Sequence, residues 1–274
     1  RSPGLGDVYK RQIKPYLCTA LFKRRRSLPH INVLKRSYET ELVIFDKDGT
    51  LLDFKETWIA IIQELIHAID AYQPMTGDLQ ERIEHALGIY PDKKEIDGYG
   101  PLAMGTFSEC NALICYCLYR EGQRWDMAQN IVEKVGKQVF GPATRKRNVK
   151  AAPGALELLK ALKSRGIATA VATNDKESDA RVDMDLIGAS PYIDLVVGAD
   201  SVANAKPAPD MVEKICSSLG KTSRNSILIG DTIMDALLGR NSGVMLTIGV
   251  SGIVSPETLA EHVDVVVSSL KDIT

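Results

Sequence analysis

The fold of this chain follows from one segment, which reads Leu42-Val43-Ile44-Phe45-Asp46-Lys47-Asp48-Gly49-Thr50-Leu51-Leu52-Asp53. Its unbroken apolar run predicts a strand buried on both faces of a parallel sheet. Open α/β sheets bind ligands outside the carboxyl ends of their strands, so Asp46 and Asp48 are expected in a site there. Two carboxylates in one site can divide the work between a nucleophile and a proton donor.

The bulk composition is that of an ordinary globular protein: of 274 residues, 45% are hydrophobic and 25% are charged. No apolar run reaches the roughly 18 residues of a membrane span.

The first 41 residues hold ten Lys or Arg and three acidic residues, which leaves 24 basic and 32 acidic residues beyond them, a net charge of −8. We therefore expect neither a nucleic-acid partner nor a membrane partner, and the composition does not indicate the oligomeric state.

The first 40 residues are expected to be an extension outside the fold. Residues 7–12 match a translated transposon end of the kind used in sequencing libraries, and the first methionine is Met75, so we expect the chain to be a fragment. Residues 8–38 contain no Asp or Glu, and their basic and apolar residues are typical of a transit peptide. The alternatives are a disordered basic tail and a translated untranslated region. The expected compartment is therefore the cytoplasm or the mitochondrion.

The hydrophobic pattern changes twice along the chain. Residues 54–149 show apolar residues at helical spacing, with a Gly- and Pro-rich loop at 91–105, and contain no convincing strand. From 150 onward, strands expected at 167–172, 193–197, 226–229, 244–248 and 263–267 alternate with helices. That alternation predicts right-handed crossovers and a mostly parallel sheet.

The fold class is therefore α/β. We predict a Rossmann-like core formed by residues 41–53 and 150–274, with helices on both faces of its sheet. An all-helical cap over residues 54–149 is inserted after the first strand.

Polar residues follow four of the expected strands or stand in the loops after them, where they meet at one edge of the sheet. The four polar segments, which we call stations, are Asp46 to Thr50, Thr173-Asn174, Lys206 before Pro207, and Asp231 to Asp235.

Together, the stations supply what phosphoryl transfer needs, namely an in-line nucleophile and groups that neutralise the equatorial oxygens. Asp46 can attack phosphorus and form an aspartyl phosphate, and Asp48 can protonate the leaving oxygen and then activate water. The remaining roles are phosphate binding by Gly49, Thr50, Thr173, Asn174 and Lys206; Mg²⁺ binding by Asp46 and Asp231; and support of the metal waters or of Lys206 by Asp235.

This order of motifs resembles the haloacid dehalogenase superfamily, over about residues 41–53 and 150–250. Four motifs carry the resemblance: Asp-x-Asp-x-Thr at Asp46, Asp48 and Thr50; a Ser or Thr at Thr173; a Lys at Lys206; and a pair of acidic residues at Asp231 and Asp235. The resemblance implies that the backbone carbonyl of Asp48 also contacts Mg²⁺ and that the inserted helices close over the site.

Within that superfamily, the chain looks most like the phosphoglycolate phosphatases. The resemblance implies a Mg²⁺-dependent phosphatase acting on a small phosphorylated metabolite, with 2-phosphoglycolate as the leading candidate. Three departures leave the substrate open. Lys47 stands where Leu or Met is usual, Phe54 stands where Ser is common, and Ser242-Gly243 stands in place of the usual Ala-Gly pair.

Other functions of the same scaffold are less well matched. A dehalogenase or a phosphonatase would lack the second aspartate, which is present as Asp48. A sugar phosphomutase would share all four motifs and is the main alternative. A regulatory protein on an inactive scaffold would lack a nucleophile or a metal ligand, and this chain has both.

Overall fold

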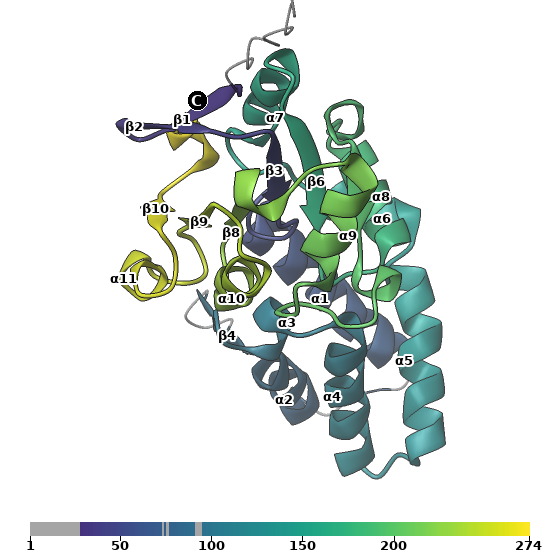
Figure 1. The fold of residues 1–274 in the computed structure, drawn as a ribbon. Coiled ribbons are helices and arrows are strands. Elements are labelled where there is room, and N and C mark those ends of the chain that lie inside the picture. Colours follow the sequence, from purple (N-terminus) through teal and green to yellow (C-terminus); the bar gives the residue numbers. More distant parts are fainter. Residues whose placement is uncertain (1–27, 73, 75–76, 91–94) are drawn as a thin grey trace, which may run out of the picture.

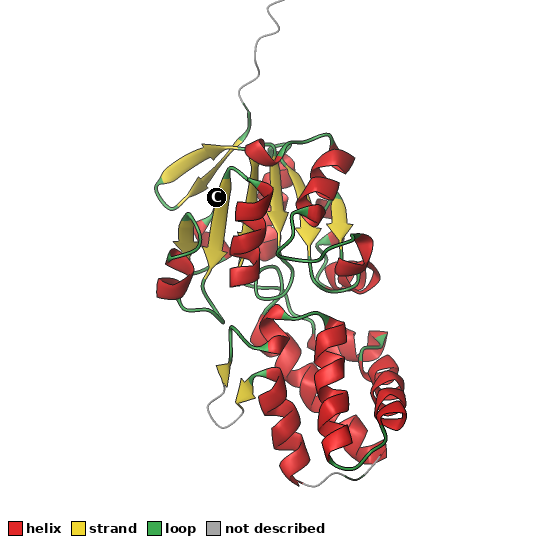
Figure 2. Cartoon of the chain, turned by 60° about the horizontal axis from the view of Figure 1, so that its bottom comes forward, coloured by secondary structure: helices red, strands yellow, loops and turns green. Residues whose placement is uncertain are grey.

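The computed structural model describes residues 28–72, 74, 77–90 and 95–274. In this part of the chain, six strands pair in parallel to form one sheet (Figures 1 and 2). Across the sheet they are β10 (Val265–Val267), β9 (Leu246–Val250), β8 (Ser226–Gly230), β3 (Leu42–Phe45), β6 (Ala168–Ala172) and β7 (Leu195–Val197).

Strand β3 lies between β8 and β6, and its four side chains are fully buried. Successive side chains of a strand point to opposite faces of a sheet. Val43 and Phe45 accordingly pack into the core beneath one face, whereas Leu42 and Ile44 pack into the core beneath the other. A strand that is buried on both faces has no polar side to show, which is why its sequence is continuously apolar.

Helices cover both faces of the sheet. Leu158 and Leu159 of α7 and Met184 of α8 pack with Val43, and Met211 and Ile215 of α9 pack with Ile44. The helices of this part of the chain are α7 (Ala155–Ser164), α8 (Glu177–Leu186), α9 (Asp210–Leu219), α10 (Ile233–Ser242) and α11 (Pro256–Ala260), with short 3-10 turns at Ser190–Tyr192, Ala199–Ser201, Ser223–Asn225 and Leu270–Asp272. The expected α/β class, a parallel sheet between two helical layers, is confirmed.

A helical insert follows β3 in the chain and lies below the sheet in Figure 2. It has a hydrophobic core of its own. Its helices are α1 (Phe54–Tyr72), α2 (Gly77–Leu87), α3 (Pro101–Met104), α4 (Phe107–Arg120), α5 (Trp125–Val139) and α6 (Pro142–Asn148). The two connections to the sheet run side by side, because Asp53 N donates to Lys150 O at 2.9 Å and Ala152 N donates to Leu51 O at 2.9 Å. The insert is therefore tethered at the end of β3 where Asp46 lies.

The expectation that the insert contains no strand was wrong. Strands β4 (Ile89–Tyr90) and β5 (Glu95–Ile96) pair antiparallel, with Ile89 opposite Ile96. Helix α3 also lies within the segment that we expected to be a loop. Two-residue strands and a single helical turn are too short to produce a periodic pattern, so tertiary contacts such as the burial of Ile89 and Ile96 in the insert core stabilise them.

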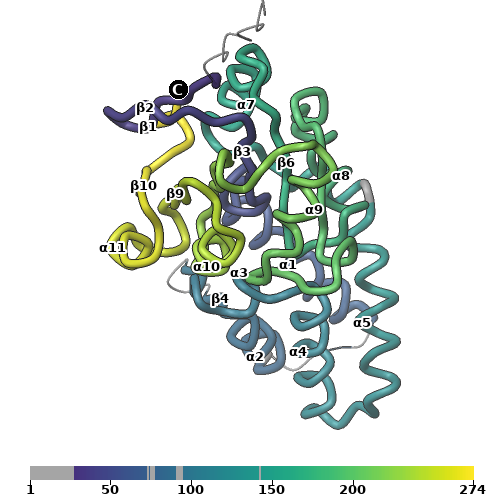
Figure 3. Tube along the Cα trace, viewed as in Figure 1, coloured from purple at the N-terminus to yellow at the C-terminus, as the bar shows by residue number. Residues whose placement is uncertain are grey.

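The end of the expected extension is also corrected. Strands β1 (His30–Val33) and β2 (Arg36–Glu39) form an antiparallel hairpin beside the C-terminus (Figure 3), where Asn32 N donates to Thr274 O at 2.6 Å. Ile31 and Val33 are buried in the same core as Val43. The basic composition of the segment obscured this short apolar alternation.

The transposon-like match at residues 7–12 and most of the transit-like segment lie outside the described residues. The expected compartment, cytoplasm or mitochondrion, stays a prediction. No described helix combines the length and the apolar character needed to cross a bilayer.

The hairpin gives a stability test. We expect Ile31→Ala to lower the free energy of unfolding by about 2–5 kcal/mol, because it removes buried methylene groups and leaves a cavity. The control is Leu34→Ala at the exposed hairpin turn, where the change should stay within about 0.5 kcal/mol. Urea unfolding of the full chain measures both, and equal effects would contradict the assignment of the hairpin to the core.

Candidate active site

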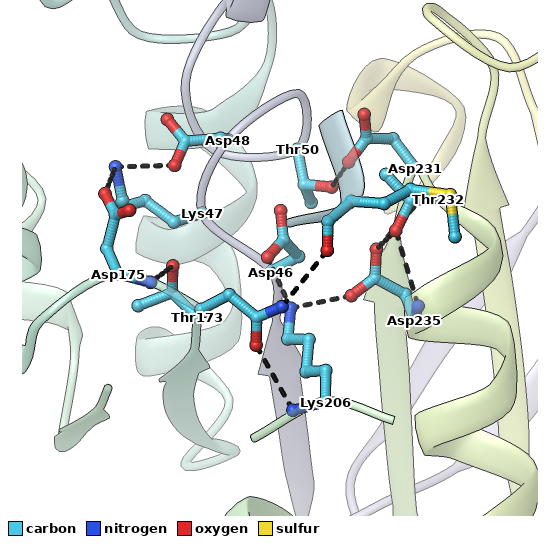
Figure 4. A network of polar contacts seen from close by, with 12 residues as sticks. Asp46, Lys47, Asp48, Thr50, Thr173, Asp175, Lys206, Asp231, Thr232 and Asp235 are labelled. Atoms are coloured by element: carbon cyan, nitrogen blue, oxygen red, sulfur yellow. Dashed lines mark hydrogen bonds and ion pairs between the residues drawn. The ribbon is translucent and has the colours of Figure 1, made fainter. Parts of the chain in front are cut away.

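Asp46 is the first residue after β3, and its backbone N–H extends the pairing with β8 by donating to Ile229 O at 2.8 Å. Its buried carboxylate accepts a hydrogen bond from Lys206 Nζ, which also donates to Asp235 Oδ1 at 2.7 Å (Figure 4). Lys206 comes from the loop before α9, and Asp235 comes from the first turn of α10. Three segments that are far apart in the sequence thus meet around one ammonium group.

Asp231 lies beside this group, at the end of β8, and is fully buried. Thr50 Oγ1 donates to its Oδ1 at 3.3 Å, whereas its Oδ2 has no hydrogen-bond partner among the described residues. Gly49 makes this arrangement possible: it has a φ of +86°, and a Cβ at this position would lie 2.0 Å from Asp231 Oδ2. The Gly-Thr pair therefore positions the carboxylate of Asp231.

The carboxylates of Asp46, Asp231 and Asp235 form a group that can hold a cation, with one oxygen of each within 4.8 Å of the others. Asp235 Oδ2 is already engaged, because Thr232 Oγ1 donates to it at 2.6 Å and Thr232 N donates to it at 3.1 Å. Asp46 and the unpartnered Asp231 Oδ2 are thus the better donors. Hard carboxylate oxygens of this kind fit Mg²⁺, so the residues present suit the expected ion.

The pKa values of Asp46 and Asp231 are raised mainly by burial and further by the neighbouring carboxylates. Burial, with a further contribution from Asp235 and Asp48, raises the pKa of Asp46 to about 7, although Lys206 opposes this rise. Burial and the neighbouring Asp46 hold the pKa of Asp231 well above its usual range. A bound cation would relieve both effects, because it stabilises the ionised carboxylates.

Asp48 points away from this group. Its carboxylate lies 2.7 Å from Lys47 Nζ (Figure 4). It also accepts a hydrogen bond from Trp58 Nε1 at 2.7 Å. The expected metal contact of Asp48, through its backbone carbonyl, stays a prediction. Burial raises the pKa of Asp48, while Lys47 opposes the rise, so its carboxyl group is suited to carry a proton.

The other expected phosphate-binding residues lie at the same edge of the sheet. Thr173 Oγ1 accepts a hydrogen bond from Asp175 N at 3.2 Å, which leaves its hydroxyl hydrogen available. Asn174 bridges the two parts of the chain: its side-chain oxygen accepts from Lys206 N at 3.2 Å, and its amide donates to Met104 O of α3 at 3.5 Å. Gly49 N instead donates to Leu52 O within its own loop.

Sequence reasoning missed a second buried cluster of charges next to the first. Lys47 is 1% exposed and lies 3.0 Å from both Asp175 and Asp183, in addition to its contact with Asp48. Asp183 of α8 also binds Arg145 of α6 at 2.6 Å. Arg145, in a run that composition alone suggests is solvated, is buried. The signal was present in Lys47 itself, a charged residue where the resemblance predicts Leu or Met.

A cavity of about 70 Å³ lies between the insert and the sheet and has two unlike ends. At the sheet end, Asp46, Asp48, Asp175, Lys206 and neighbouring polar residues line it. At the insert end the lining is mainly apolar, and it consists of Phe54, Trp58, Ile62, Leu65, Leu102, Ala103, Met104, Gly105, Phe107, Cys110, Asn111, Ile114 and Phe140. We call this cavity the chamber.

A family model described as haloacid dehalogenase-like hydrolase matches residues 40–243. The chain belongs to this hydrolase family. The match spans both the site and the helical insert, so the resemblance inferred from four short motifs is confirmed.

Similar proteins extend the comparison. A pyrophosphatase PpaX of Halalkalibacterium halodurans is 27% identical over 75% of this chain and 81% of that protein. A probable phosphatase IndB of Dickeya dadantii is 31% identical over 77% of this chain and 80% of that protein. Among solved structures, a predicted phosphoglycolate phosphatase of Haemophilus somnus has a TM-score of 0.66 at 17% identity and covers 85% of this chain and 96% of its own, which supports the fold.

The Lys47 cluster predicts a large loss of stability on Lys47→Met. The substitution leaves Asp48 and Asp175 without their cation and leaves Asp183 with Arg145 alone. Removing one partner of a buried ion pair costs about 3–5 kcal/mol in comparable cases. Lys176→Met, at an exposed lysine nearby, is the control and should change the free energy of unfolding by less than about 0.5 kcal/mol. Denaturant unfolding of both variants checks this, and a Lys47→Met chain as stable as the parent would show that the ion pairs are energetically neutral.

Proposed function

We propose that this hydrolase is a Mg²⁺-dependent phosphatase that cleaves a small phosphomonoester through a phosphoryl group carried on Asp46. The observation that carries the proposal is the placement of Asp46 at the polar end of the chamber, between a buried lysine and Asp231. The names of the relatives, a pyrophosphatase and a probable phosphatase, support phosphoryl transfer as the type of reaction.

In the first step, a carboxylate oxygen of Asp46 attacks phosphorus as the ester P–O bond breaks. The alcohol leaves as its oxygen takes the proton of Asp48, so no alkoxide is released. A raised pKa favours the protonated form that this step needs, and Trp58 and Lys47 orient the carboxyl group through their contacts with it.

In the second step, Asp48 is ionised and accepts a proton from water, which attacks the same phosphorus. The P–O bond to Asp46 breaks, and inorganic phosphate leaves. Asp48 is then protonated again and Asp46 is free, so the residues return to their starting state. The burial of Asp46, Lys206 and Asp231 limits access of other water molecules to the phosphoryl group.

Lys206, Thr173 and Asn174 are the residues that we assign to binding the phosphoryl oxygens. Burial lowers the pKa of Lys206, but Asp235 and Asp46 raise it by more, so the lysine stays charged. When bound by Asp46 and Asp231, Mg²⁺ would neutralise charge on the transferred group. Asp235 is a positioning residue, because it holds Lys206 and is itself held by Thr232.

Two finer assignments stay open to assay. 2-Phosphoglycolate is the substrate that the sequence resemblance favours. A sugar phosphomutase would use the same residues and would return the phosphoryl group from Asp46 to a second sugar oxygen. We favour hydrolysis over mutase activity, because the insert side of the chamber offers few polar groups to hold a sugar in two orientations.

Substitution of the two carboxylates tests the mechanism. We expect Asp46→Asn to abolish phosphate release with Mg²⁺ and p-nitrophenyl phosphate, because an amide is not a competent nucleophile. Asp48→Asn should lower kcat by about a hundredfold or more, because proton transfer to the leaving oxygen is lost. Asp78→Asn, at an exposed aspartate of α2, is the control and should leave kcat unchanged. Full turnover by Asp46→Asn would overturn the mechanism.

Metal binding can be tested without turnover. Mg²⁺ at a hundredfold excess over its Kd should raise the Tm of the parent chain by roughly 5–10 °C, because it binds only the folded state. Asp231→Asn should raise the Tm measured without Mg²⁺, because an amide avoids the free energy needed to protonate the buried carboxylate or to bury it ionised. The same substitution should abolish the shift that Mg²⁺ produces. An unchanged Mg²⁺ shift in that variant would exclude Asp231 as a ligand.

A further inference from the structure

We propose that the alcohol released by this enzyme is apolar, so that its substrate is a short alkyl or aryl phosphate rather than a phosphorylated carboxylic acid or sugar. The inference rests on the proposed function, because it assigns the chamber to the leaving group of that reaction. The evidence for it is that the insert side of the chamber is mainly apolar and aromatic and carries no cation among the described residues.

The wall opposite the carboxylates is built mainly from packed aromatic rings. Phe54 and Trp58 lie on the first two turns of α1, with ring centroids 6.4 Å apart, and Trp58 and Phe140 are 6.3 Å apart. Phe107 meets Phe140 edge to face at 4.6 Å. Such contacts hold the rings in place, so the apolar surface is already formed before a ligand binds.

The polar atoms on the insert side are mostly engaged. Trp58 Nε1 donates to Asp48, and Cys110 Sγ donates to Pro101 O at 3.3 Å. Burial raises the pKa of the Cys110 thiol to about 12, so it stays neutral. Asn111 is the third polar side chain among the described insert residues that line the chamber. Its amide can bind one uncharged polar atom of a ligand.

Within the described residues, no cation of the insert lines the chamber, whose single lysine, Lys206, lies at the phosphate end. Two exposed arginines of the insert have partners outside the chamber lining. Arg120, at the end of α4, donates to Tyr116 Oη at 3.4 Å, and Arg124, just before α5, pairs with Asp126 at 2.7 Å. A second anionic group on the substrate would therefore be buried without a partner, which is strongly unfavourable.

The size of the chamber limits the alcohol. One water needs about 10–15 Å³ of such space, so a cavity of about 70 Å³ holds the equivalent of roughly five waters. A leaving group of about four to six non-hydrogen atoms fits this space. Within that limit, each methylene that is buried should strengthen binding roughly fourfold.

A calorimetric series tests the chamber without any chemistry. Alkylphosphonates have a P–C bond in place of the ester bond and are not cleaved, so their affinities for the full chain with Mg²⁺ report binding alone. We expect Kd to fall roughly fourfold per carbon from methylphosphonate to butylphosphonate. Phosphonoacetate, which carries a carboxylate, should bind at least tenfold more weakly than propylphosphonate. A flat alkyl series, or tighter binding of phosphonoacetate, would overturn the inference.

A substitution in the wall should change the preference. Met104 lines the chamber, is half-buried, and can be replaced by a lysine of similar length. We expect Met104→Lys to lower kcat/KM for butyl phosphate by tenfold or more and to raise it for 2-phosphoglycolate. Met127→Lys, at an exposed methionine of α5 outside the chamber, should leave both values unchanged. Equal ratios in the two variants would contradict the inference.

The two proposals fail in different ways. Faster hydrolysis of 2-phosphoglycolate than of any alkyl or aryl phosphate by the parent chain would overturn the apolar leaving group and leave the phosphatase standing. The expected phosphonate series without phosphate release from any ester would overturn the phosphatase but would support the apolar chamber.

Discussion

Burial of charge at the carboxyl end of β3 is the constraint on which the rest of this structure depends. A carboxylate removed from water is strongly destabilised unless a cation or hydrogen bonds compensate it. Here Lys206 compensates Asp46 and Asp235, and Lys47 compensates Asp48, Asp175 and Asp183. Asp231 remains the least compensated member, with one oxygen unpartnered. The site thus contains more buried carboxylates than cations, and a divalent cation is suited to compensate the remaining negative charge.

The same constraint connects the helical insert to the sheet. Asp48 receives its hydrogen bond from Trp58 of the insert, and Asp183 of the sheet layer pairs with Arg145 of the insert. Asn174 adds a third link, between the loop of Lys206 and the backbone of α3. These contacts hold the apolar side chains of the insert against the charged residues at the edge of the sheet. The proton donor and the wall that selects the leaving group therefore belong to one packed unit.

The parts of the fold that the sequence predicted correctly were those with a strong local pattern. The run 42–45 had to be a strand buried on both faces, and the strand–helix alternation after residue 150 had to give a parallel sheet. The hairpin at residues 30–39 and the strand pair β4–β5 were missed because each has only two to four residues per strand, and their few apolar positions are recognisable only once the core that they contact is known. Among the site residues, motif spacing brought together Asp46, Lys206, Asp231 and Asp235, which the structure also places together.

The sequence by itself determined which residues gather at the active-site edge of the sheet. Residues that directly follow parallel strands lie at the same edge, independently of the rest of the chain. Only the tertiary structure decided the direction of each side chain and the nature of the space in front of it. Asp48 faces Lys47 and Trp58 rather than Asp231, and the aromatic residues of α1, α4 and the end of α5 converge on one chamber. The physical reason is that side-chain direction and cavity lining result from long-range packing between the two cores, which no local pattern records.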